Sequence, residues 1–240
     1  MSKRAAILQS NYIPWKGYFD IINAVDEFIL LDDVQYTKHD WRNRNRIKTP
    51  QGIQWLTIPI RTRGRWPLPI RDVEVEPSAW ARKHWKTIAQ SYGKAVHFKQ
   101  LGPVFEQLYA TLDERHLSDL NRRFITTICG LLGIRTRITW SMDYCLVEGR
   151  NERLVDLCRQ VGADVYLSGP AAKAYLDEGL FRAHSIQVQY MDYSGYPEYE
   201  QLYPPFEHAV SILDLLFCQG DDAPRYMKSF QTDRLVGTTR

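Results

Sequence analysis

Apolar residues occur along the chain in short runs that alternate with stretches of helical spacing. Residues 4–9 and 27–31 are brief apolar runs, each followed by polar residues, as in buried strands. Between them, residues 15–24 place apolar side chains at helical intervals behind Pro14, a residue that suits the first turn of a helix. We therefore predict that the chain opens with a strand, a helix and a second, parallel strand.

The next segment has the alternation of a β-hairpin. Two alternating stretches, residues 41–48 and 53–60, flank a Thr49–Gly52 turn with proline at its second position and glycine at its fourth. A four-residue connection fixes the register, and three cross-strand pairs are expected: Arg44 with Thr57, Arg46 with Trp55, and Lys48 with Ile53. The arginines then share a face with Trp55, where cation–π stacking is expected.

The middle of the chain is predicted to be helical and its second half to alternate again. The expected helices are 78–92, 103–112, 117–132, 152–161, 171–176 and 211–218, and the expected strands are 134–140, 164–167 and 186–191. These elements predict an α/β fold: a mainly parallel sheet with flanking helices, an inserted basic β-hairpin and a helical middle segment. We expect one domain over residues 1–240, with 78–133 as a candidate helical subdomain.

Composition narrows the class of protein. The 240 residues are 44% apolar and 25% charged, as in ordinary globular proteins. No window approaches 18 uninterrupted apolar residues, so no membrane-spanning helix is expected. The four cysteines lack CxxC spacing and lie in apolar runs, which indicates reduced thiols in a cytoplasmic protein. The oligomeric state is left open by these features.

Charge is distributed unevenly along the chain. The net charge is only +3, yet residues 38–71 hold nine of the 31 lysines and arginines and one of the 28 acidic residues. Such a block suits phosphates, nucleotide sugars or nucleic acid, although a solvated basic face has the same composition.

The turn after the first strand is the first candidate binding segment. Loops at the carboxyl ends of parallel strands are where α/β proteins bind ligands. Gly17 near a helix start would let a phosphate or substrate approach the backbone. The helix N-terminus also favours an anion. The candidate substrate-binding residues of this segment are Gln9, Tyr12, Trp15, Gly17 and Tyr18. Packing of these aromatic residues beneath the hairpin is the structural alternative.

Two carboxylates follow the second strand. Asp32 and Asp33 could bind magnesium or act as a general base, or they could serve as ordinary turn residues. With Lys38 they form the candidate catalytic set. The candidate substrate-binding residues that follow are Tyr36, Arg42, Asn43, Arg44, Asn45, Arg46 and Trp55, with the arginines expected to hold phosphates or a carboxylate.

A second strand-to-helix turn, near residue 168, is a further candidate binding segment. Ser168 and Gly169 offer a hydroxyl and backbone amides for an anion or a sugar hydroxyl, and a plain helix cap is the alternative. Tyr166 stands where a serine-hydrolase elbow would need glycine, which argues against that class. Tyr175, shortly after this turn, is the last candidate substrate-binding residue.

Taken in order, these motifs make the chain resemble the WbqC-like protein family over nearly its whole length. The matching landmarks are Gln9–Phe19, Asp32–Tyr36, Asn43–Asn45 with Ile47, Trp55–Pro59, Tyr166–Gly169, Tyr175–Leu176, and Ser211–Leu216 with Gly220. Ser10 departs from the proline expected in most relatives, which affects only the local turn. The resemblance implies a link to bacterial surface-polysaccharide and O-antigen gene clusters, and a glycine-transferase role for some members. It carries no catalytic residues over.

Together these features favour a group-transfer enzyme, either a transferase or an ATP-dependent amide-forming ligase. It would move an amino-acid or acyl group, such as glycine, to an amino sugar or similar amine. ATP with magnesium could activate the carboxylate, or the donor could arrive activated as a thioester or aminoacyl-tRNA. The expected partners are a small-molecule or nucleotide-linked sugar substrate and, for the second route, an aminoacyl carrier or tRNA. The alternatives are a non-catalytic nucleotide-sugar or nucleic-acid binding module that uses the basic hairpin 38–71, and a structural role in a biosynthetic complex.

Overall fold

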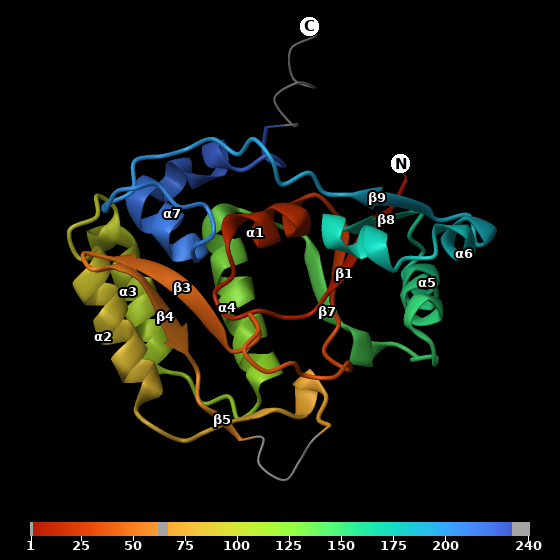
Figure 1. Cartoon of the computed structure of the whole chain (residues 1–240), viewed down its shortest axis with the longest axis horizontal. Helices are drawn as coiled ribbons and strands as arrows, with labels where there is room; N and C mark the ends of the chain where they lie inside the picture. The colour runs from red at the N-terminus through yellow and green to blue at the C-terminus, as the bar shows by residue number, and fades with distance from the viewer. Residues whose placement is uncertain (1, 62–66, 232–240) are drawn as a thin grey trace, which may run out of the picture.

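Five parallel strands form the central sheet in the computed structural model, which describes residues 2–61 and 67–231 (Figure 1). In spatial order the strands are β7 (Arg137–Trp140), β2 (Glu27–Leu30), β1 (Arg4–Leu8), β8 (Val165–Ser168) and β9 (Gln187–Tyr190). Numbered along the chain, these strands have the order 3-2-1-4-5 of a doubly wound sheet. The α/β class with a parallel sheet is thereby confirmed.

Helices surround this sheet. Their bounds are α1 Lys16–Asn23, α2 Trp80–Tyr92, α3 Phe98–Ala110, α4 Leu117–Leu132, α5 Arg150–Gln160, α6 Glu178–Ala183 and α7 Ile212–Gln219. Figure 1 shows α5 and α6 on one side of the sheet and α1 and α4 on the other. Within the described residues, no helix has the length and apolar character that a membrane crossing requires.

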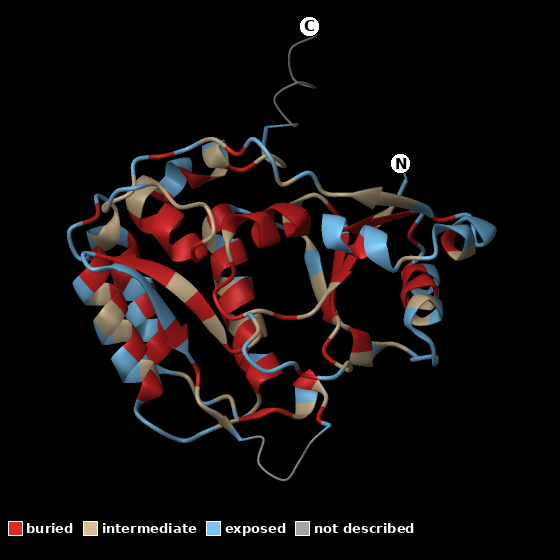
Figure 2. Ribbon diagram, in the orientation of Figure 1, coloured by how far each residue is buried: buried red, intermediate tan, exposed pale blue. Residues whose placement is uncertain are grey.

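Both faces of the three central strands, β2, β1 and β8, are buried, which explains why the sequences of these strands are mostly apolar. Along β1, Ala5 and Ile7 belong to one apolar cluster with the inner face of α5. Ala6, between them, points the other way into the larger cluster built with α1 and α4. Figure 2 shows the central strands buried almost throughout. Because successive side chains of a strand point to opposite faces, β1 contributes to both apolar clusters.

The hairpin forms with the expected register. Strand β3 (Arg44–Thr49) pairs with β4 (Gly52–Thr57), and all three predicted cross-strand pairs are present. The Arg44 guanidinium lies 4.3 Å from the centre of a Trp55 ring, as the shared face requires. Gly52 has φ +106°, a conformation that a residue with a Cβ rarely adopts. A second, shorter pair follows, β5 (Ile60–Arg61) with β6 (Glu74–Val75). Residues 62–66 of the basic block lie outside the described residues.

Two predicted boundaries in the helical segments were wrong. Helix α3 begins at Phe98, not at Pro103, which lies inside it. The centre of the Phe98 ring lies 5.1 Å from that of the Phe217 ring in α7. This packing stabilises the first turn of α3, which the proline seemed to preclude. In place of the helix expected over residues 171–176, the chain forms a short 3-10 helix, Pro170–Ala174, and the regular helix α6 follows later.

The segment between β9 and α7 crosses the molecule and is fixed by two buried carboxylates. Asp20 accepts a hydrogen bond from the Tyr196 hydroxyl at 2.6 Å. Asp214 accepts hydrogen bonds from Tyr199 at 2.8 Å and from Tyr92 at 3.0 Å. Because both carboxylates are fully buried, these hydroxyls replace the water that they lose on folding.

We predict that His84 makes the fold sensitive to mild acid. His84 is buried, its Nδ1 lies 3.0 Å from the Tyr12 hydroxyl, and burial lowers its pKa to about 4. The unfolded chain takes up a proton near pH 6.5, while the folded protein does not until about pH 4. The contribution of His84 to stability is therefore complete above pH 6.5, and about 3 kcal/mol of it is lost as the pH drops to 4.

Urea denaturation of the wild type and His84→Gln between pH 7 and pH 4 measures this contribution. The variant should start less stable and lose less stability on acidification, so that the two curves converge. Parallel curves would show that His84 does not carry the effect.

Candidate functional site

A cavity of about 840 Å³ opens at the carboxyl ends of β1 and β8. Gln9, just after β1, lines it from one side, and Ser168 and Gly169, at the end of β8, line it from the other. These neighbouring strands connect onward in opposite directions, β1 to β2 and β8 to β9. The cavity therefore lies at the topological switch point, where doubly wound sheets bind ligands.

Three arginines line this cavity. They are Arg42, Arg150 and Arg153, and the described lining contains no aspartate or glutamate. Amide and hydroxyl side chains make up most of the remaining polar lining: Gln9, Asn11, Gln35, Tyr166, Ser168 and Tyr175. Guanidinium groups in a concave site match the oxygens of phosphates and carboxylates. The carboxylates that pair with Arg153 and Arg42 lie outside the lining.

Arg153 is held in place by Asp33. Its Nη1 lies 2.8 Å from Asp33 Oδ2, and its Nε donates a hydrogen bond to the Val147 carbonyl at 3.1 Å. The Asp33 side chain is only 4% exposed and also accepts a hydrogen bond from Ser141 Oγ. Asp33 therefore holds the Arg153 guanidinium in place at the edge of the cavity.

Arg150 begins α5, whose N-terminus faces the cavity. Its guanidinium lies 3.3 Å from the centre of the Tyr175 ring, so that a second cation is fixed by an aromatic face. Gly149, Arg150, Arg153 and Leu154 all line the cavity, which aims the positive end of the helix dipole at the same space.

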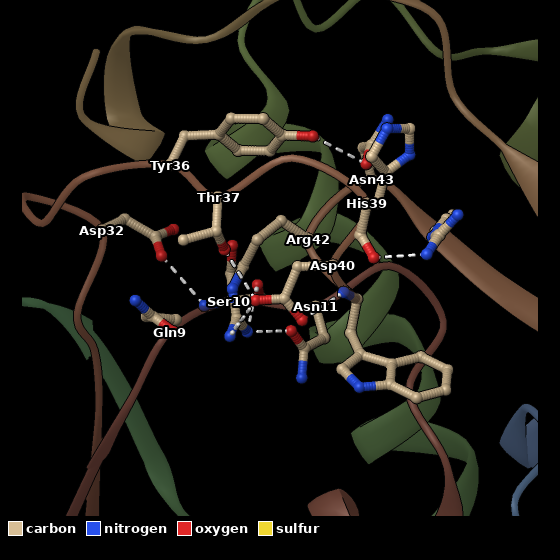
Figure 3. A network of polar contacts seen from close by, with 12 residues as sticks. Gln9, Ser10, Asn11, Asp32, Tyr36, Thr37, His39, Asp40, Arg42 and Asn43 are labelled. Carbon is tan, nitrogen blue, oxygen red and sulfur yellow. Dashed lines mark hydrogen bonds and ion pairs between the residues drawn. The ribbon is translucent and has the colours of Figure 1, made fainter. Parts of the chain in front are cut away.

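Arg42 belongs to a network that joins the hairpin segment to the turn after β1 (Figure 3). Its guanidinium donates a hydrogen bond to Asn11 Oδ1 and lies 3.3 Å from the Asp40 carboxylate. The Arg42 carbonyl accepts a hydrogen bond from Asn121 Nδ2 at 2.9 Å. Its buried Nε–H has no acceptor within the described part of the chain.

Asp32 is a buried anchor beneath the cavity. Its Oδ1 accepts a hydrogen bond from the Ser10 amide at 2.9 Å, and its Oδ2 accepts one from Ser118 Oγ at 2.5 Å. Burial raises the pKa of Asp32, and these two hydrogen bonds oppose that rise. Because the Ser10 bond fixes the turn after β1, Asp32 sets the positions of Gln9 and Asn11.

The two carboxylates do not form a preformed magnesium site. Each of the four oxygens of Asp32 and Asp33 already has a protein partner, either a hydrogen-bond donor or the Arg153 cation. A magnesium ion would have to displace these partners and approach Arg153 closely. Over residues 2–61 and 67–231, no group of three or more histidine, cysteine or acidic side chains has an arrangement that could hold a metal.

Five of the site residues predicted from the sequence line the cavity, and several others are buried close to it in the sequence or through hydrogen bonds. The five are Gln9, Arg42, Ser168, Gly169 and Tyr175. Of the predicted substrate-binding residues that line no cavity, five are buried: Tyr12, Gly17, Tyr18, Tyr36 and Asn43. Tyr18 donates its hydroxyl hydrogen to the Gln9 carbonyl at 2.9 Å, and Tyr36 donates to Asn43 Oδ1 at 2.9 Å. A Cβ at Gly17 would lie 2.3 Å from the Trp15 ring, so glycine makes room for that indole.

The remaining predicted residues lie outside the cavity lining. Arg44, Arg46 and Trp55 form the outer face of the hairpin, and Lys38 is exposed. Trp15 and Asn45 line a separate, smaller hollow.

Sequence reasoning missed Arg150 and Arg153. Both stand at the start of an amphipathic helix, where charged residues are most often solvated, and no local spacing distinguishes them from Arg159 of the same helix. Only the pairing of Arg153 with Asp33, 120 residues away, marks it as part of a site.

Comparison with known proteins identifies the family. The sequence model of the WbqC-like protein family matches residues 9–226, so the chain belongs to that family. It is also 50% identical over 226 residues to the "Uncharacterized protein Rv1507c" of Mycobacterium tuberculosis (strain ATCC 25618 / H37Rv), covering 94% of this chain and 98% of that protein. No solved structure matches the chain.

We predict that Ser118→Ala destabilises the protein by about 2 kcal/mol or more, because it removes a hydrogen bond to the buried Asp32 carboxylate. The same change also removes the acceptor of the Trp140 indole N–H, which lies 3.1 Å from Ser118 Oγ. Ser91→Ala is the matched control: Ser91 is a buried helical serine that donates to a backbone carbonyl, Thr87 O. It should cost less than about 1 kcal/mol. Equal losses for both variants in chemical denaturation would contradict the anchoring role of Asp32.

Proposed function

We propose that this member of the WbqC-like family is a group-transfer enzyme whose cavity binds a nucleotide-linked amino sugar. It would transfer an amino-acid or acyl group, such as glycine, to the sugar amine during bacterial surface-polysaccharide biosynthesis. The observation that carries the proposal is the set of three arginines in one cavity that lacks lining carboxylates. The polysaccharide context rests on the family resemblance.

The cavity suits a diphosphate and its substituents. Its volume of about 840 Å³ falls in the range of roughly 300–1,000 Å³ typical of ligand sites. Arg150 and Arg153 present guanidinium groups from one helix terminus, so they can share the charge of adjacent phosphates. Gln9, Asn11 and Ser168 offer neutral donors and acceptors for hydroxyl groups.

The arrangement favours a donor that is activated before it binds. In amide formation the amine nitrogen attacks the carbonyl carbon, a C–N bond forms, and the bond to the leaving group breaks. The leaving group keeps the electron pair and takes the proton that the amine releases. With a thioester or aminoacyl ester this step needs no adenylation, which agrees with the full engagement of Asp32 and Asp33 by protein partners. Asp33 then contributes by positioning Arg153, and a catalytic role for Lys38 stays a prediction.

We expect Arg153→Gln and Arg150→Gln each to weaken nucleotide-sugar binding by roughly tenfold to a hundredfold, because each removes a charge-assisted hydrogen bond to phosphate. Isothermal titration calorimetry with uridine-, thymidine- and guanosine-diphosphate sugars measures the effect. Arg159→Gln is the control, since Arg159 lies on the same helix with its side chain 57% exposed and paired with Asp156. Failure of the wild-type protein to bind any of these compounds, or equal affinity of all three variants, would contradict the proposal.

The hairpin supports a second candidate function, a non-catalytic module for nucleotide sugars or nucleic acid. The observation in its favour is the exposed pair of indoles, Trp41 and Trp55, with the Arg44 guanidinium over Trp55. This alternative places the ligand anion on Arg44 instead of Arg153. Arg44→Gln would then weaken binding while Arg153→Gln would leave it unchanged.

A further inference from the structure

A small aromatic hollow adjoins the arginine cavity. It has a volume of about 200 Å³ and is lined by Asn11, Pro14, Trp15, Trp41, Asn45 and Ala209. Asn11 also lines the larger cavity, so this side chain borders both spaces. A ligand that lies in the arginine cavity and extends past Asn11 would enter the hollow.

Three segments that are distant in sequence form the walls of the hollow, and each is held in place by hydrogen bonds. The Trp41 carbonyl accepts a hydrogen bond from the Tyr12 amide at 3.1 Å. The Asn45 side chain donates to the Tyr12 and Ile13 carbonyls, both at 3.0 Å. The Ala209 carbonyl accepts a hydrogen bond from Arg46 Nη2 at 2.6 Å. The walls are thus fixed before a ligand binds, which lowers the entropy lost on binding.

The chemistry of the walls is that of a ring-binding site. Trp41 is 40% exposed and lines the hollow, and Trp15 supplies a second aromatic wall. Arg42 occupies Asn11 Oδ1, while Asn11 Nδ2 has no hydrogen-bond partner among the described residues. Stacking surface and a free amide donor together suit a ring with apolar faces and oxygen atoms at its edge.

We propose that this hollow binds the sugar ring of the nucleotide-linked substrate, with Trp41 as the stacking surface and Asn11 as the donor to a ring substituent. The C–H faces of a pyranose pack on an indole, and its hydroxyl groups lie at the ring edge. The inference rests on the proposed function, because the arginine cavity has to hold the diphosphate.

The volumes of the two spaces indicate which end of such a substrate lies in each. The nucleoside end carries two linked rings, a base and a ribose, and it matches the cavity of about 840 Å³. The sugar end is a single ring, and it matches the hollow of about 200 Å³. The reactive amine of the sugar would then lie near Asn11, which borders both spaces.

Paired titrations test this assignment. Each nucleoside diphosphate (UDP, dTDP and GDP) is titrated beside its sugar conjugates, and the affinity ratio of conjugate to diphosphate is measured by calorimetry. For at least one conjugate we expect this ratio to exceed about five in the wild type. Trp41→Ala should bring it to about one without weakening diphosphate binding, whereas Arg153→Gln should weaken both ligands.

Two further variants test whether a loss of sugar preference comes from the hollow itself. Ala209→Leu places a larger side chain in the hollow and should also remove the sugar preference, independently of any effect of Trp41→Ala on folding. Ile53→Ala is the control, since Ile53 is an equally exposed apolar residue of the same hairpin, 42% exposed, and does not line the hollow. Circular dichroism confirms that each variant is folded.

The outcomes separate the two proposals. If diphosphates bind but no conjugate binds more tightly, the sugar subsite is wrong and the arginine site stands. If Trp41→Ala weakens diphosphates and conjugates alike, the hollow binds the nucleobase and the assignment is overturned. If neither class binds the wild-type protein, the proposed function fails, and the subsite fails with it.

Discussion

The buried carboxylate of Asp32 is the constraint on which the site depends. A charge with no solvent exposure has to be satisfied by the protein, and here the Ser10 amide and the Ser118 hydroxyl satisfy it. Those two bonds join the end of β2 to the turn after β1 and to α4. Asn121 of α4 then binds Ser10 Oγ and the Arg42 carbonyl, so the same anchor reaches the segment that supplies the first arginine.

Sheet topology supplies the other half of the site. The crossover from β1 leads to one side and that from β8 to the other, which leaves the space between their carboxyl ends uncovered by a connection. Helix α5 enters this space with its N-terminus, and Asp33 fixes Arg153 there through an ion pair of low exposure. The aspartate pair thus divides two structural tasks, since Asp32 holds the loop and Asp33 holds a cation.

Local pattern predicted the elements well because each is determined by nearby residues. The hairpin register follows from a four-residue turn, and helix α4 ends at Gly133, whose φ is +73°. The start of α3 could not be predicted, because burial of Phe98 against Phe217 of α7 outweighs the proline that follows. Of the site, the strand-end residues Gln9 and Ser168 could be predicted from their place in the pattern. Arg150 and Arg153 could not, since their role arises from contacts with Tyr175 and Asp33 that the sequence does not display.

The central claim is that the arginine cavity binds the anionic part of the substrate. A crystal structure of the protein saturated with a nucleotide sugar tests it most directly. The account predicts phosphate density against Arg150 and Arg153, between the ends of β1 and β8. Phosphate density on the hairpin face, at Arg44 and Trp55 with the cavity unchanged, would contradict the account and favour the non-catalytic binding module.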